Sequence, residues 1–162
     1  MVTYNMKLGI LSDSHDNLPK IEKAVKFFNK QKVGFVLHAG DFVAPFTIPK
    51  LKNLNCDWKG VFGNNDGERI GLDRISAGKI QEGPLRIELD HKKVILVHDI
   101  NTISPGREDA ALVIFGHTHK PEILKKDNQL LINPGEAGGW LTDKSTVAIV
   151  DLTALSGKIF NL

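Results

Sequence analysis

Histidine, aspartate and asparagine residues follow short apolar runs at five places in the sequence. The clearest case is Leu-Val-Ile-Phe-Gly at 112–116, which leads directly into His117 and His119. Counted over all five runs, the donors are Asp13, His15, Asp41, Asn64, His98, His117 and His119. Nitrogen and oxygen donors without thiolate suit Mn²⁺, Fe²⁺, Co²⁺, Ni²⁺ or Zn²⁺. Seven donors are too many for one tetrahedral zinc and suit two ions about 3.5–4 Å apart.

Each apolar run indicates a buried strand, and ligands of layered α/β proteins bind outside the carboxyl ends of such strands. Five strand ends could therefore deliver their polar residues to one place. Side chains two positions apart on an extended chain project to the same side, so we expect His117 and His119 to lie next to one another. Asp13 and Asp41 follow runs that should be interior, where aspartate is rare unless it is paired or metal-bound. The clustering favours a two-metal site over polar strand ends that merely face solvent.

Strands and helices alternate in the first half of the chain. Residues 18–31 place apolar side chains three and four apart behind a cap at Asn17 or Asp16, which predicts an amphipathic helix. Residues 44–54 contain two prolines and predict a short or kinked helix. After a strand at 57–62, residues 67–77 are polar with glycine at both ends, and they predict an irregular loop with room for one helical turn beside the site.

The second half of the chain is dominated by strands that pair as hairpins. Alternation and turn residues predict three pairs, 85–89 with 93–97, 122–125 with 129–132, and 146–151 with 158–161, the last turned at Ser156-Gly157. Residues 101–109, with Pro105-Gly106, leave no room for a full helix. Helical units followed by hairpins predict an α/β fold in which two mixed β-sheets pack face to face with helices outside, a four-layer α/β/β/α sandwich.

Length and composition limit the alternatives. With 162 residues, we expect one domain spanning 1–162. The 21 basic and 19 acidic residues nearly balance, so the chain gives no electrostatic signal for nucleic acid or a membrane as the main partner. The single Cys56 excludes a disulfide framework and a thiolate cluster. No apolar stretch of about 20 residues is present, and Met1–Lys7 shows no leader, so we expect a cytoplasmic protein.

The motif order D-x-H, G-D, G-N-x-D, H and G-H-x-H, running from Asp13 to His119, resembles the calcineurin-like metallophosphoesterases. It is most similar to their small YfcE-type and archaeal phosphodiesterase branch, whose fold the retromer subunit shares. The resemblance implies the same four-layer fold and a metal-dependent phosphodiesterase, a hydrolase in which a hydroxide bridging two metal ions attacks phosphorus. Manganese is the first choice of metal, with Ni²⁺, Zn²⁺, Fe²⁺ and Co²⁺ as alternatives.

The resemblance also assigns the ligands. It implies that one ion is held by Asp13, His15 and His119, that the other is held by Asn64, His98 and His117, and that Asp41 bridges the two. A carboxylate has two oxygens and can bind two cations, which makes the bridging role physically sensible.

One departure from the family pattern concerns the leaving group. Larger phosphatases of the superfamily carry a histidine after the G-N motif that can protonate it, whereas here Gly63-Asn64 is followed by Asn65-Asp66. We therefore place Asn64 and Asp66 in the catalytic site. Asp66, two positions after Asn64, could orient a metal-bound water, although a carboxyl with the ordinary pKa of about 3.9 is a poor acid at neutral pH. Alternatively, Asp66 only caps the loop that begins at Gly67.

Of four further features, three each have two interpretations. His38 either supports the site or belongs to the core, and His91 is expected in a solvated turn. Arg107 could meet a phosphate but is more simply a solvated loop residue. The loop Asn133–Trp140 is either a plain turn or a wall of the cleft.

Three functions are compared. The leading one is a phosphodiesterase whose partner is a phosphate-ester substrate, with a nucleotide-derived diester as one candidate and a homodimer as one option for its assembly. The second is a non-catalytic protein-binding scaffold like the retromer subunit, which retention of all seven ligands argues against. The third is a phosphomonoesterase or protein phosphatase. The missing donor histidine weakens the protein phosphatase, as does the lack of large loops that could form a peptide groove.

Overall fold

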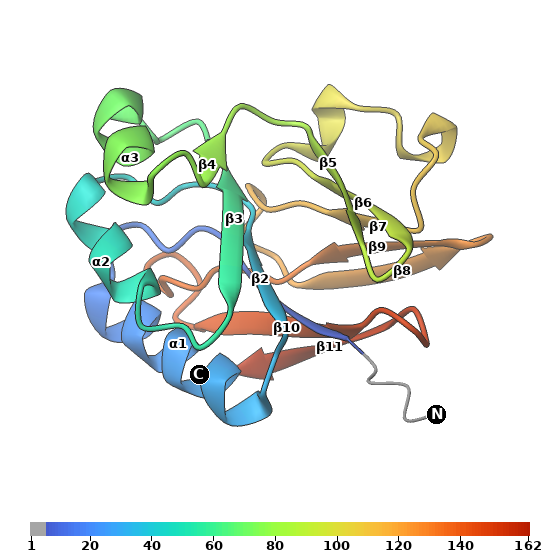
Figure 1. Ribbon diagram of the computed structural model, residues 1–162, viewed down its shortest axis with the longest axis horizontal. Coiled ribbons are helices and arrows are strands. Elements are labelled where there is room, and N and C mark those ends of the chain that lie inside the picture. Colours follow the sequence, from blue (N-terminus) through green and yellow to red (C-terminus); the bar gives the residue numbers. More distant parts are fainter. Residues whose placement is uncertain (1–5) are drawn as a thin grey trace.

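The computed structural model describes residues 6–162 and consists of two β-sheets packed face to face, with three helices against one of them (Figure 1). The first sheet has six strands in the order β11-β10-β1-β2-β3-β4, and the second has five in the order β5-β6-β7-β9-β8. The expected absence of a leader falls partly on residues 1–5, outside the described residues. Among residues 6–162, no helix is both long enough and apolar enough to cross a bilayer.

The strands of the first sheet are β1 (Lys7–Leu11), β2 (Phe35–His38), β3 (Asp57–Val61), β4 (Ile80–Gln81), β10 (Thr146–Asp151) and β11 (Ser156–Asn161). Those of the second sheet are β5 (Leu85–Leu89), β6 (Lys92–Leu96), β7 (Leu112–Ile114), β8 (Glu122–Lys126) and β9 (Gln129–Asn133). Strands β1 to β4 run parallel to one another, and so do β6, β7 and β9. Each sheet therefore presents several strand carboxyl ends at one edge.

Two apolar layers hold the fold together. The layer between the sheets takes Leu8 and Ile10 of β1 and Ile114 of β7, all fully buried. The layer between the first sheet and the helices includes Phe28 of α1 (Leu18–Gln31), whose ring lies over β1. A Cβ atom at Gly9 would lie 2.8 Å from that ring, so the glycine lets the helix approach the strand. Burying side chains of this size stabilises the fold by roughly 1.5–3 kcal/mol each.

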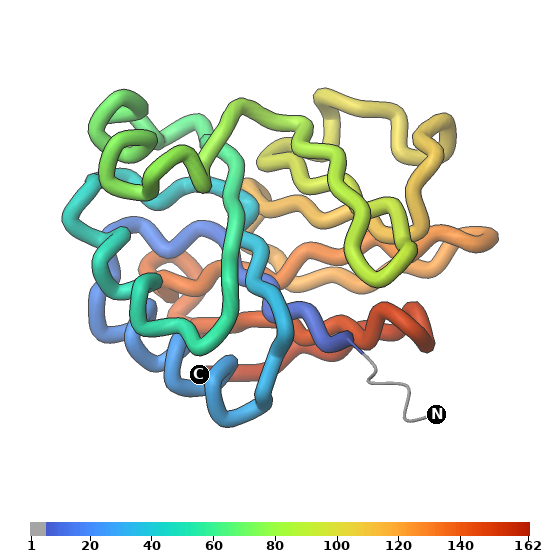
Figure 2. Tube along the Cα trace, viewed as in Figure 1, coloured from blue at the N-terminus to red at the C-terminus, as the bar shows by residue number. Residues whose placement is uncertain are grey.

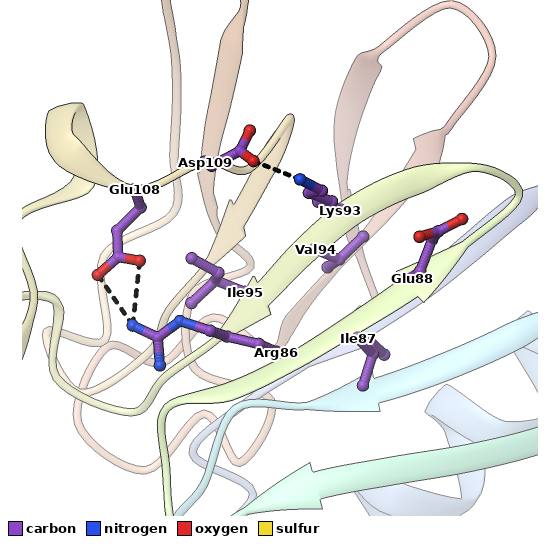
Figure 3. A pocket seen from close by; sticks show the side chains of 8 residues that line it. All are labelled: Arg86, Ile87, Glu88, Lys93, Val94, Ile95, Glu108 and Asp109. Atoms are coloured by element: carbon purple, nitrogen blue, oxygen red, sulfur yellow. Dashed lines mark hydrogen bonds and ion pairs between the residues drawn. The ribbon is translucent and has the colours of Figure 1, made fainter.

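The outer face of the second sheet is covered by a loop segment instead of α-helices. The segment between β6 and β7 contains two 3-10 turns, η2 (Ile100–Thr102) and η3 (Pro105–Arg107), and no α-helix (Figure 2). Arg86 of β5 donates to both oxygens of Glu108 at 2.9 and 3.0 Å, and Lys93 of β6 pairs with Asp109 (Figure 3). The eight residues around this hollow of about 390 Å³ include none of the seven predicted metal ligands.

The four-layer prediction is confirmed with a reduced outer layer on this side, and most predicted elements are present. The helix at 18–31 has the predicted bounds and is capped by the Asn17 side chain, which accepts from the Lys20 backbone N–H. The proline-containing segment forms η1 (Pro45–Thr47) followed by the single turn α2 (Ile48–Leu51). All three hairpins form with the expected partners.

Two local predictions are wrong. The irregular loop expected at 67–77 is largely the helix α3 (Arg69–Ser76), because Leu72 is fully buried against the helix-side core and tertiary packing overrides the polar composition. Its end is capped by Ala77, whose φ of +55° places it in the left-handed region. The last hairpin turns at 152–155, and Ser156 already belongs to β11, which places the turn before the predicted Ser156-Gly157.

His38, at the end of β2, belongs to the core. Its Nδ1 accepts the backbone N–H of Gly40 at 3.1 Å, so Nε2 carries the proton and donates to the Ser14 hydroxyl at 3.0 Å. The ring stacks on Phe42 at 3.7 Å between centroids. Burial lowers the pKa of His38 to about 3, so the imidazole is neutral in the folded protein.

This burial predicts a pH dependence of stability. Between pH 6.5 and about 3 the unfolded chain binds a proton at His38 that the folded chain does not, so the stabilisation is present above pH 6.5 and is lost as the pH falls. We expect wild type to lose about 2 kcal/mol more free energy of unfolding than H38Q between pH 7 and pH 5. Urea denaturation at both pH values measures this. H91Q, which removes an exposed turn histidine, is the control and should keep the wild-type difference. Equal pH dependence in wild type and H38Q would contradict the assignment.

Candidate metal centre

The seven predicted donors lie together where β1, β2, β3, β6 and β7 end. Strands from both sheets contribute, because the parallel arrangement directs these carboxyl ends toward one edge. Contacts of 2.8 to 3.8 Å connect the donor atoms into one cluster. The fold therefore brings segments up to 106 residues apart together at one place.

One group of donors consists of Asp13, His15, Asp41 and His119. Each offers a ligand atom, and these atoms lie within 4.8 Å of one another. His15 Nε2 lies 3.4 Å from Asp41 Oδ2, and His119 Nε2 lies 3.5 Å from Asp13 Oδ1. The rings of His15 and His119 stack with centroids 5.2 Å apart.

A second group consists of Asn64, His98 and His117. The Asn64 side-chain oxygen lies 2.8 Å from His98 Nε2 and 2.9 Å from His117 Nδ1. Asp41 adjoins both groups, because its Oδ2 lies 3.4 Å from His15 Nε2 and 3.6 Å from His98 Nε2. The arrangement divides the donors into two sets that share one carboxylate.

Several donor atoms have no hydrogen-bond partner among the described residues. Asp13 Oδ1 and His15 Nε2 are buried without a hydrogen bond from any described residue. His98 Nδ1 donates to the Ala39 carbonyl at 2.7 Å, which leaves Nε2 with a lone pair directed at the Asn64 oxygen. Lone pairs facing one another at this distance repel unless a cation lies among them. Atoms about 3 Å apart can bind one ion with bonds of about 2.1 Å, so these residues fit divalent metal ions.

Asp13 is oriented by its neighbours. Its Oδ2 accepts from the Ser12 hydroxyl at 2.5 Å and from the His117 backbone N–H at 3.1 Å, which leaves Oδ1 for the cluster. A Cβ atom at Gly116 would lie 1.9 Å from Ser12 Oγ, so the glycine of the G-H-x-H motif is needed for this approach. Burial alone would raise the pKa of Asp13, but His15, the Ser12 hydroxyl and the nearby histidines bring it below its usual value.

Asp41 is held by Asn65, a residue that the sequence analysis treated only as a missing histidine. The Asn65 backbone N–H donates to Asp41 Oδ1 and its side-chain amide donates to Oδ2, both at 2.8 Å. A Cβ atom at Gly63 would lie 2.1 Å from Oδ1. The segment Gly63-Asn64-Asn65 therefore supplies a predicted ligand, a clamp on Asp41 and the space that Asp41 occupies.

The backbone conformation at the donors differs from the prediction. Five of the seven have a left-handed φ: Asp13 (+53°), His15 (+40°), Asp41 (+61°), His117 (+68°) and His119 (+61°). Strand β7 ends at Ile114, so the expectation that an extended chain sets His117 and His119 side by side is wrong. The left-handed backbone directs His117 to the Asn64 group and His119 to the Asp13 group. Such conformations cost about 1–3 kcal/mol each and concentrate at functional sites.

Asp66 lies next to the site and is almost fully buried. Its carboxylate accepts three backbone N–H groups, from Asp41 at 3.0 Å and from Val43 and Gly63 at 2.7 Å. Residues 64–65 form a turn, so the expected extended geometry from Asn64 to Asp66 is wrong. Burial raises the pKa of Asp66 despite these hydrogen bonds. The contacts fix the loops that carry Asp41 and Asn64, and a direct part in catalysis stays a prediction.

The loop after β9 forms a wall of the site, so its interpretation as a plain turn is wrong. Glu136 is buried, and its carboxylate accepts the backbone N–H groups of Trp140 at 2.8 Å and Thr142 at 3.0 Å. His119 Nδ1 lies 3.5 Å from the same carboxylate. Burial opposes ionisation of Glu136, but hydrogen bonds from Leu141 and Thr142 outweigh it and lower the pKa. No motif marks Glu136, so the sequence analysis missed it.

His91 and Arg107 both lie outside the donor cluster in the described structure. His91 lies exposed in the β5–β6 turn, as expected. Arg107 is exposed in η3 and makes no contact with the donor cluster within the described residues, which agrees with a solvated loop arginine.

Comparison with known proteins places these motifs in a family. The profile of the calcineurin-like phosphoesterase superfamily domain matches residues 6–155. Phosphodiesterase MJ0936 of Methanocaldococcus jannaschii is 40% identical over 156 residues, which cover 90% of this chain and 93% of the relative. Vacuolar protein sorting-associated protein 29 of Schizosaccharomyces pombe is 28% identical over 140 residues, covering 83% of this chain and 73% of that protein.

Solved structures agree. A structure described as a novel archaeal phosphodiesterase superposes with a TM-score of 0.89 at 37% identity and covers 97% of this chain and 100% of its own. The phosphoesterase YfcE from E. coli superposes with a TM-score of 0.74 at 18% identity, covering 96% and 98%. The second similarity is one of fold alone.

The bracing contacts of Asp66 can be tested by substitution. In wild type the Asp66 carboxylate accepts three backbone N–H groups. In D66N one oxygen is replaced by an NH₂ group, which is itself a donor and cannot accept them. We therefore expect the free energy of unfolding to fall by about 2 kcal/mol. Urea denaturation in EDTA measures this without metal. D73N, which changes an exposed carboxylate of α3, is the matched control and should stay within about 0.5 kcal/mol of wild type. A D66N protein as stable as D73N would show that the bracing is unimportant.

Proposed function

Because the chain belongs to the calcineurin-like phosphoesterase superfamily, we propose that it is a phosphodiesterase that works with two divalent metal ions. The observation that carries the proposal is the position of Asp41, whose Oδ2 lies within 3.6 Å of both His15 Nε2 and His98 Nε2. A relative named as a phosphodiesterase, 40% identical to this chain, supports the reaction class.

The ions, when bound, would supply a hydroxide for in-line attack on phosphorus and positive charge to stabilise the phosphoryl oxygens. We assign Asp13, His15 and His119 to one ion, Asn64, His98 and His117 to the other, and Asp41 to both. Asn64 is neutral, so the donor set carries only two carboxylates and leaves the ions electrophilic. Manganese is our first choice, and the nitrogen and oxygen donors suit it.

The residues around the ligands hold them in place. Glu136 lies beside His119, as carboxylates do beside many metal-binding histidines, and Asn65 clamps Asp41. We keep Asp66 in the site as a positioning residue that fixes the loops of Asp41 and Asn64. Asn65 stands at the position where larger phosphatases have a histidine. Because its amide is hydrogen-bonded to Asp41, no side chain at this position can give a proton to the leaving group.

A protein-binding scaffold is the second candidate, favoured by the similarity to vacuolar protein sorting-associated protein 29. A scaffold needs no ions, and it would be destabilised by Asp13 Oδ1 and His15 Nε2, which are buried without a hydrogen bond. The phosphodiesterase therefore accounts for more of the site. We place the enzyme in the cytoplasm, where the single Cys56 suits a reducing environment, with a nucleotide-derived diester as one candidate substrate and a homodimer as one candidate assembly.

Metal content tests the proposal directly. After loading with Mn²⁺ and desalting, elemental analysis should give two ions per chain. D41N should lose both, because Asp41 is assigned to both, and H98N should keep one. H91N changes an exposed histidine outside the site and should keep two. A wild-type protein that saturates at one ion would overturn the two-ion assignment.

Leaving-group preference tests the missing proton donor. A nitrophenolate departs as an anion, whereas an alkoxide needs a proton, and general acids typically contribute 10²–10⁴-fold. We expect methyl p-nitrophenyl phosphate to be hydrolysed at least about 100-fold faster than dimethyl phosphate, and faster than alkyl monoesters. Steady-state rates with the Mn²⁺-loaded protein measure this. Similar rates for the aryl and alkyl esters would mean that another residue donates the proton.

A further inference from the structure

A small pocket adjoins the metal centre on the side of the loop after β9. It has a volume of about 210 Å³ and is lined by His15, Asn65, His119, Glu136, Trp140 and Leu141. Four of these residues are of two kinds. His15 and His119 are assigned metal ligands, and Trp140 with Leu141 forms an apolar wall directly beside them.

The wall consists of large apolar side chains that face solvent. Trp140 is 62% exposed and Leu141 is 77% exposed. The other exposed large apolar side chains of the described residues are Phe46, Ile70, Ile123 and Leu124, and none of them lines this pocket. Exposed apolar surface at the rim of a polar site commonly marks where a ligand binds.

Hydrogen bonds hold the loop that carries this wall in place, although its side chains are exposed. The indole N–H of Trp140 donates to the His15 carbonyl at 2.9 Å, and its backbone N–H donates to Glu136 at 2.8 Å. The Asn17 amide donates to the Gly138 carbonyl at 2.7 Å, which ties the loop to the start of α1. A Cβ atom at Gly138 would lie 3.2 Å from the indole ring and 2.9 Å from the Ser14 carbonyl, so the ring packs closely over this glycine. A preformed surface binds with little ordering cost.

We propose that Trp140 and Leu141 bind a planar aromatic group esterified to the substrate phosphate, an aryl ring or a nucleobase, and so determine which phosphodiesters the site accepts. This rests on the proposed function. Indole and aromatic rings pack in offset or edge arrangements, and stacking of a base on an aromatic side chain is tolerant of which base it is. With the phosphate at the metal centre, an ester group directed toward this loop meets Trp140 first.

The simpler interpretation gives Trp140 a structural role only. In that case its indole N–H ties the loop to His15, and replacing the ring lowers stability or weakens all ligands alike. The two interpretations differ in one measurable quantity, the preference for an aromatic over an aliphatic ligand with the same phosphorus group.

The experiment measures binding by calorimetry to the Mn²⁺-loaded protein. Phenylphosphonate and methylphosphonate form one pair. The methylene phosphonate analogues of adenosine 5′-monophosphate and of ribose 5-phosphate form a second pair, and comparing the two pairs distinguishes a nucleobase from a simple ring. None of the four is hydrolysed. We expect wild type to bind the aromatic member of at least one pair about tenfold more tightly. W140A should reduce this preference to about twofold or less, and W140F should restore most of it.

Two further variants keep the test independent of folding. In L141A the backbone N–H that binds Glu136 is retained and the lost side chain is mostly exposed, so the protein should fold and show a smaller loss of preference. L124A removes a half-exposed leucine of β8 outside the pocket and should keep the wild-type preference. Fluorescence gives a second readout, because Trp58 is 4% exposed and quenching by the bound ring should come from Trp140.

Equal preference in wild type, W140A and L141A would overturn the proposal, as would an equal weakening of both ligands of a pair. These outcomes are separate from the proposed catalysis. If the protein hydrolyses phosphodiesters but shows no Trp140-dependent preference, the proposed function stands and the binding role of Trp140 is wrong. If the protein shows the preference but hydrolyses no diester, the binding role of Trp140 stands and the proposed function is wrong.

Discussion

The structure depends on holding the carboxylate of Asp41 at a position where only 1% of its surface reaches water. A buried carboxylate is stable only when it is paired or hydrogen-bonded. Asn65 supplies two hydrogen bonds, and His15 and His98 approach from opposite groups. Asp66 in turn holds the backbone N–H of Asp41 itself. The loops after β2 and β3 are therefore organised around one side chain, and the parallel strands that precede them determine where that side chain lies.

The same constraint explains why the donor residues adopt an unusual backbone. A strand that continued straight past its last buried residue would carry its polar side chains away from the opposite sheet. Left-handed conformations at Asp13, Asp41 and His117 reverse the chain immediately after the core ends. Aspartate, asparagine and histidine tolerate this region better than other residues with a Cβ atom, so residue types suited to metal binding are also suited to the turn. The two apolar layers beneath the loops stabilise the fold against the strain.

The fold and the meeting of the seven side chains could be predicted because both are encoded locally, as apolar runs followed by polar residues and as hairpin alternation. What could not be predicted depends on contacts between distant segments. Helix α3 forms because Leu72 finds a core to pack on, and His117 and His119 separate because the backbone turns after β7. Asn65 matters through a residue 24 positions away, and Trp140 through one 125 positions away. Neither contact can be predicted from the spacing of residues that are close in the sequence.

The contrast between an enzyme and a scaffold comes down to what the buried donor atoms require. A scaffold on this fold would be more stable if apolar or hydrogen-bonded groups replaced Asp13 and His15, because Asp13 Oδ1 and His15 Nε2 are buried without a hydrogen bond. Here the opposite is found: Gly63 leaves space for the Asp41 carboxylate, Gly116 leaves space for the Ser12 hydroxyl and the Asp13 carboxylate, and Ser12 and Asn65 orient those carboxylates toward the cluster. Supporting groups placed this way hold two carboxylates close together among the histidine nitrogens, which stabilises a bound cation. Five strand ends and their neighbours thus form an arrangement that is unfavourable for folding alone. Binding of cations at the cluster explains why it is present.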